Sequence, residues 1–116
     1  MSETVPPRFR PILEEIVRRM SADDWEGLVA DGLASHDVTG EELSHWVHEY
    51  PARLVPLPAE AWEHSEFGRV EVEPDTWWAV VPLWTKEEGK SDLSLEATLH
   101  ERAGRVSVEI DNVHIL

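Results

Sequence analysis

The sequence contains no cysteine. This excludes disulfides, thiolate metal sites and a cysteine nucleophile, and it is typical of a reducing compartment. Long apolar runs are also missing: residues 1–20 carry four arginines and no apolar run longer than Ile12-Leu13. That pattern is not a signal peptide, and no stretch approaches the length of a transmembrane helix. We therefore expect a cytoplasmic protein that does not bind membranes.

Basic residues are few. Ten lysines and arginines oppose 24 acidic residues, which gives a net charge of −14. The excess is concentrated in residues 21–75, where fourteen acids face only Arg53 and Arg69. Such a field repels nucleic acid and anionic membranes and attracts a basic partner. The alternative interpretation is a solvated surface without a partner. There is no Gly-rich phosphate loop and no basic patch interleaved with aromatic residues.

The spacing of apolar residues predicts three helices in the first part of the chain. The first helix carries an apolar stripe at helical spacing: Ile12, Leu13, Ile16, Val17 and Met20. Ser21 and Asp24 form a variant capping box that predicts a short second helix, which Gly32 would end. Thr39 and Glu42 form a better capping box and predict the third helix.

After Pro51 the period changes to that of strands. Residues 53–57 are punctuated by prolines, which predicts an edge strand. Residues 76–84 are rich in aromatic and β-branched residues, and residues 91–101 alternate cleanly between apolar and polar. A last strand is predicted from residue 105 to the end of the chain.

The last strand, "VEIDNVHIL", changes phase. Val108 and Ile110 share one parity, whereas Val113 and Ile115 share the other. One extra residue at Asp111 or its neighbour would make a β-bulge, which bends a strand. We expect this bend to let the sheet curve over a helix, with the last strand well inside the sheet. One face of the sheet would pack on the helices and the other would face water or a partner.

These elements predict one α+β domain over residues 1–116, with helices in about 8–50 packed on a curved antiparallel sheet in about 53–116. The helix leading into "SADDWEGLVADG" and the closing "VEIDNVHIL" resemble the nuclear-transport-factor-2-like (SnoaL-like, cystatin-like cone) superfamily. That resemblance implies a cone whose mouth can hold a small molecule. More narrowly, "LVPLP", "VPLWTKEEGKSDLSLEATL" and "VEIDNVHIL" resemble a family of small uncharacterised bacterial domains, which implies no activity. Members of the superfamily include isomerases, dehydratases, hydrolases, and binding or immunity proteins, so the fold does not decide the function.

Two patterns of histidine residues are candidates for a metal site or a catalytic site. His45 and His48 lie three residues apart on the third predicted helix, close to Glu41 and Glu49, and imidazole with carboxylate suits zinc. The competing interpretation is a solvated polar face, because the apolar stripe of that helix lies opposite. His114 lies beside the predicted bulge and is the second pattern.

An acidic neighbour could orient the His114 imidazole as a general base, either Asp111 or Glu96. The alternative is a structural histidine. No further catalytic group is evident, and we expect no cofactor.

Tryptophan is the compositional oddity, with six residues. Trp77 and Trp78 are adjacent, so in a strand they point to opposite faces of the sheet. Trp84 shares the parity of Trp78, and both faces of this strand are apolar. Three explanations stay open: a dimer or partner interface, a ligand pocket, or internal burial.

Together these features favour a non-enzymatic binding module, for example one of the immunity type, whose acidic surface binds a basic protein. The predicted docking acids are exposed residues off the core stripes: Asp37, Glu41, Glu60 and Glu63. Trp77 or Trp84 would anchor the complex, with Trp78 as a further binding residue. A homodimer through the sheet is a second expectation. The alternative function is a small cone-fold enzyme or ligand-binding protein with a tryptophan-lined pocket and His114 as its base.

Overall fold

The computed structural model describes residues 3–115. Its first helix, α1 (Arg10–Ser21), follows a 3₁₀ turn at Pro7–Phe9 and has Pro11 near its start, where a missing N–H costs no hydrogen bond. The predicted apolar stripe is confirmed. Its buried members are Leu13, Ile16, Val17 and Met20, whereas Ile12 is partly buried.

Two shorter helices follow, α2 (Trp25–Ala30) and α3 (Gly40–His48). The capping box of α3 is confirmed: Thr39 Oγ1 accepts from the Glu42 N–H and Glu42 Oε1 accepts from the Thr39 N–H, both at 3.1 Å. The box predicted for α2 is wrong. Ser21 is the last residue of α1, and α2 begins after Asp24 with no side-chain cap.

The rest of the chain forms an antiparallel sheet with strand order β1-β3-β4-β5, and β2 also pairs with β3. A 3₁₀ helix, η2 (Ala59–His64), connects β1 to β2. The strands are β1 (Leu54–Val55), β2 (Glu66–Arg69), β3 (Thr76–Thr85), β4 (Gly89–Arg102) and β5 (Arg105–Ile115). The α+β class and the antiparallel sheet are therefore confirmed.

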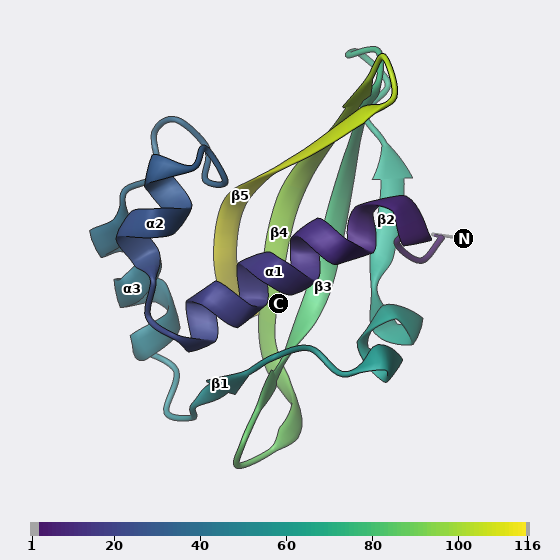
Figure 1. Cartoon of the computed structure of the whole chain (residues 1–116). Coiled ribbons are helices and arrows are strands. Elements are labelled where there is room, and N and C mark those ends of the chain that lie inside the picture. The colour runs from purple at the N-terminus through teal and green to yellow at the C-terminus, as the bar shows by residue number, and fades with distance from the viewer. Residues whose placement is uncertain (1–2, 116) are drawn as a thin grey trace.

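The predicted bulge in the last strand is also confirmed. Ala97 pairs with Ile110 and Glu96 with Asn112, which leaves Asp111 as the extra residue of β5. The strand bends along its length in Figure 1.

The expected interior position of β5 is wrong, because β5 lies at one end of the strand order. Its free edge is partly covered where the Ile110 N–H donates to the Leu33 carbonyl at 2.8 Å and the Ser35 N–H donates to the Ile110 carbonyl at 2.9 Å. A short segment after α2 thus replaces the missing strand partner at the middle of β5.

The helix α1 crosses the inner face of the curved sheet, and α2 and α3 lie beside β5 (Figure 1). The main core lies between α1 and the sheet. Fully buried side chains on both layers fill it, including Leu13, Ile16, Val81, Leu95, Leu99 and Ile110. The outer face of the sheet is partly exposed and carries polar side chains such as Glu96, Thr98 and His100.

Candidate binding site

A hollow with a volume of about 910 Å³ lies between the start of α2 and α3. Five carboxylates and two indole rings line it, together with polar residues of α3. We call it the acidic groove, and its acidic and aromatic residues are Asp23, Asp24, Glu26, Glu41, Glu42, Trp25 and Trp46.

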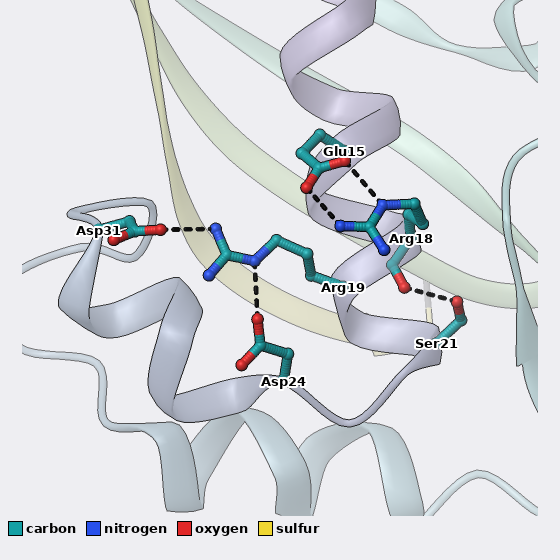
Figure 2. Close-up of polar contacts among 6 residues, drawn as sticks. All are labelled: Glu15, Arg18, Arg19, Ser21, Asp24 and Asp31. Atoms are coloured by element: carbon teal, nitrogen blue, oxygen red, sulfur yellow. Dashed lines mark hydrogen bonds and ion pairs between the residues drawn. The ribbon is translucent and has the colours of Figure 1, made fainter.

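An arginine of α1 holds α2 in place at the edge of this groove (Figure 2). Arg19 Nε lies 2.9 Å from Asp24 Oδ2, and its Nη1 lies 2.8 Å from Asp31 Oδ2. The hydrogen bonds with Asp24 and then Asp31 raise the pKa of Arg19. Gly27 permits this close approach, because a Cβ there would collide with Arg19 Nη2. The guanidinium thus ties both ends of α2 to α1.

The other wall of the groove is set by the start of α3. The Thr39–Glu42 capping box fixes where the helix begins. A Cβ on Gly40 would lie 2.6 Å from Glu26 Oε1 and 3.4 Å from the Trp25 backbone. The absence of a side chain at Gly40 therefore lets the first turns of α2 and α3 approach each other.

Trp25 and His48 meet on the wall of the groove. Their rings are 5.8 Å apart and nearly perpendicular. His48 Nε2 lies 3.0 Å from Asp23 Oδ1, and its Nδ1 lies 3.1 Å from Ser44 Oγ. Trp25 is only 8% exposed, and its Nε1 makes no hydrogen bond with any described residue. A buried donor without a partner is energetically unfavourable, so this is an unusual feature of the wall.

The two histidines of α3 do not form a shared metal site, because each contacts a different carboxylate. His45 Nε2 lies 3.0 Å from Glu49 Oε1, one turn along the helix, whereas His48 contacts Asp23. Within residues 3–115, no three histidine or carboxylate groups are placed to hold a metal ion. Their arrangement is that of two exposed imidazole–carboxylate contacts.

His114 lies on the outer face of the sheet and contacts a different acid from the one predicted first. Its Nε2 lies 2.9 Å from Glu96 Oε2, although the contact is not a well-directed hydrogen bond. Asp111 instead accepts a hydrogen bond from Thr98 Oγ1. Burial raises the pKa of Asp111, and the nearby carboxylates Glu109, Glu96 and Asp37 raise it further, against the lowering effect of the Thr98 hydrogen bond. His114 is therefore partly exposed, with its Nε2 buried beside Glu96, outside the core under α1.

The predicted tryptophan anchors occupy three environments. Trp77 packs against the core, with its ring stacked on Phe67 at 6.2 Å. Trp84 is only 8% exposed and lies beside the ring of His64, so it offers little surface to a partner. Trp78 is 38% exposed on the outer face. Of the three, only Trp78 has substantial free surface.

The four predicted docking acids do not form one surface. Glu41 lines the acidic groove, whereas Asp37 lies close enough to Asp111 to affect its pKa. Glu60 and Glu63 belong to η2, which lies between β1 and β2 on the opposite side of α1 from α3 (Figure 1). A single docking contact therefore cannot centre on all four.

Trp25 and Trp46 are among the groove residues that sequence reasoning did not single out as site residues. A local signal was present. Acids flank both indoles, in "DDWE" and "EELSHW". A core stripe on one side of a short helix does not exclude a large ring from reaching a groove on the other side.

No described helix is long and apolar enough to cross a membrane.

Comparisons with known proteins identify the family to which this chain belongs. Searches of the curated proteins and of the solved structures gave no match. One family model matches residues 15–116, a span that includes α2, α3, the whole sheet and every residue of the acidic groove. The chain therefore belongs to the family described as "Domain of unknown function (DUF7668)".

Proposed function

We propose that this protein is a non-enzymatic binding module whose acidic groove receives a basic segment of a partner protein. The observation that carries the proposal is the lining of the groove, in which five carboxylates lie with the partly buried Trp46 and the edge of the almost fully buried Trp25. An immunity-type role, in which the basic partner is a toxin, is one form of this function.

The groove chemistry matches arginine and lysine side chains. A guanidinium or ammonium group over an indole gains about 0.5–2 kcal/mol, depending on how far it is desolvated. Carboxylates beside the ring add charge-assisted hydrogen bonds. Arg19, held by Asp24 and Asp31 at the edge of the same groove, is an intramolecular example of the carboxylate part of such binding.

The net charge of −14 supports fast association with such a partner. Long-range attraction raises the association rate and is screened by salt, so the rate should fall as ionic strength rises. Aromatic contacts act after the encounter, and they should mainly slow dissociation.

The test compares two charge-reversal variants of equal net charge. Glu26→Lys with Glu41→Lys alters the acidic groove, and Glu60→Lys with Glu63→Lys alters η2. The probe is a fluorescein-labelled peptide of five arginines alternating with glycine, mixed with each variant by stopped flow at several salt concentrations. We expect the groove variant to slow association by about tenfold or more and the η2 variant to slow it by about twofold or less.

Equal losses in the two variants would show that only net charge matters and would overturn the groove as the site. No salt-dependent binding by the unmodified protein would overturn the proposed function. Far-UV circular dichroism and thermal melting establish that both variants are folded.

The cone assignment and the pocket alternative have unequal support. The bent β5 and the position of α1 on the inner face of the sheet support the cystatin-like cone, which we propose as the finer fold. A small-molecule site inside it has less support, because buried side chains of α1 and β4 such as Leu13, Leu95 and Leu99 fill this region. His114, the proposed base, lies outside this region and instead lines a groove between α3 and the end of β5.

A homodimer through the outer sheet face is a weaker proposal. The exposed Trp78 favours it, but Glu96, Glu109 and Asp111 lie on the same face. A second copy would bring like charges together at neutral pH. Sedimentation equilibrium at high and low salt tests it: a dimer that forms only at high salt fits this charge distribution.

A further inference from the structure

A second groove opens at the C-terminal end of α3, between that helix and the last residues of β5. Its volume is about 410 Å³. We call it the apolar groove, after its apolar lining residues Trp46, Tyr50, Pro51, Leu93, Val113 and Ile115.

The apolar groove combines a buried base with an exposed rim. Leu93 and Val113 are almost fully buried, whereas Ile115 is 60% exposed. An aliphatic side chain placed against Ile115 would remove apolar surface of both molecules from water. The groove is therefore a site for an apolar side chain.

The walls of the apolar groove are already in place. The Tyr50 hydroxyl donates to Glu88 Oε1 at 2.6 Å and accepts from the Asp92 N–H at 3.3 Å. The hydrogen bond to Glu88 raises the pKa of Tyr50, because it favours the neutral phenol. A groove whose walls are fixed loses little conformational entropy when it is filled.

The two grooves adjoin along α3. Trp46 lines both of them. His45 lines the acidic groove and Glu49 lines the apolar groove, and their exposed side chains form an ion pair of 3.0 Å. One face of α3 thus leads from the first groove to the second.

We propose that one partner segment occupies both grooves, with cationic side chains in the acidic groove and an aliphatic side chain against Ile115. This inference rests on the proposed function and adds an apolar residue to the recognised sequence. Charge selects this occupant: Glu49 at the apolar groove and the carboxylates beyond Trp46 disfavour an acidic segment, and a second copy of this chain has a net charge of −14. Trp25, which lines the acidic groove, has a buried Nε1 with no hydrogen-bond partner among the described residues.

The experiment uses two matched sets of acetylated, amidated peptides. Each peptide has two arginines, then one, three or five glycines, then leucine, and a second group has the reverse order. In the matched set alanine replaces leucine. Isothermal titration at low and high salt gives the affinities. At one spacing we expect the leucine peptide to bind about tenfold more tightly than its alanine counterpart, and this ratio should persist at high salt.

Protein variants locate the effect. Ile115→Ser should reduce the leucine preference to about threefold or less, because it removes the exposed wall of the groove. Val72→Ser, which alters an exposed apolar residue outside both grooves, should leave the preference unchanged.

The outcomes separate the two proposals. If the alanine peptides bind in a salt-dependent way and leucine adds nothing at any spacing, this inference is wrong and the proposed function stands. If no peptide of either set binds, both are wrong. If a leucine peptide with glycines in place of its arginines binds as tightly as the parent, the groove has an apolar partner and the basic segment proposed here is wrong.

Discussion

At the scale of single residues, Asp111 illustrates how a bulge places an acid. The extra residue of β5 directs its carboxylate toward Thr98 on the neighbouring strand, close to Glu109 and Glu96. A carboxylate that is partly desolvated among other carboxylates is disfavoured in its ionised form. The bulge in β5 therefore places the Asp111 carboxylate where its ionised form is disfavoured at neutral pH.

The raised pKa of Asp111 predicts the sign of a pH effect. A carboxyl whose pKa is higher in the folded than in the unfolded chain destabilises the fold as pH rises from the unfolded value, about 3.9, through the folded value. Asp111→Asn keeps an acceptor for Thr98 and removes the charge. We expect this variant to unfold at higher urea concentration than the parent at pH 7, with the difference shrinking as pH falls through this window.

Asp92→Asn makes the same change in net charge on an exposed residue and serves as the control. If Asp111→Asn is the less stable protein at pH 7, the hydrogen bond to the ionised carboxylate outweighs the desolvation, and this account of Asp111 is wrong.

At the scale of elements, the short helices depend on contacts outside themselves. Helix α2 has six residues and no side-chain cap, so it would not persist alone. Arg19 of α1 forms an ion pair at each end of α2, with Asp24 and with Asp31. Helix α3 has its own capping box and packs against β5. The acidic groove therefore depends on one tertiary bridge and one local cap.

The capping box makes a prediction for α3. Thr39→Ala removes the acceptor of the Glu42 N–H and should lower the free energy of unfolding by about 0.5–2 kcal/mol. Thr39→Ser keeps the hydroxyl and should lower it by much less. Urea denaturation measures both, and amide hydrogen exchange should speed up in the first turn of α3. Equal stability of the alanine and serine variants would show that packing against β5 alone positions the helix.

At the scale of the whole molecule, the excess of acid that supports the proposed basic partner also opposes folding. Like charges repel most in the compact state, and added salt screens that repulsion. Salt also weakens exposed ion pairs such as Arg18–Glu15 and His45–Glu49, but these contribute little. With a net charge of −14, repulsion should dominate.

We therefore expect the melting temperature to rise by a few degrees between low salt and about 0.15 M, where the Debye length falls to about 8 Å. Differential scanning calorimetry measures this change. Glu71→Gln with Glu73→Gln, in an exposed turn, should reduce the salt dependence. A melting temperature that falls with salt would mean that attractive ion pairs outweigh the repulsion.

Features encoded by local patterns could be predicted from the sequence. The stripe of α1, the Thr39–Glu42 box and the β5 bulge depend on residues close together in the chain, so period and spacing revealed them. The opposite orientations of Trp77 and Trp78 follow from the strand alone. Among the site residues, the charge of residues 21–75 pointed to a basic partner, and Glu41 was placed in the candidate surface.

The remaining features depend on which distant segments pack together, and only the tertiary structure decided them. It covered part of the β5 edge with residues 33–35, held α2 through Arg19, and separated Glu60 and Glu63 from Glu41. It also placed Trp46 between two grooves. Local periodicity assigns a side chain to a face of its own element, but burial or exposure of that face depends on the neighbour that covers it.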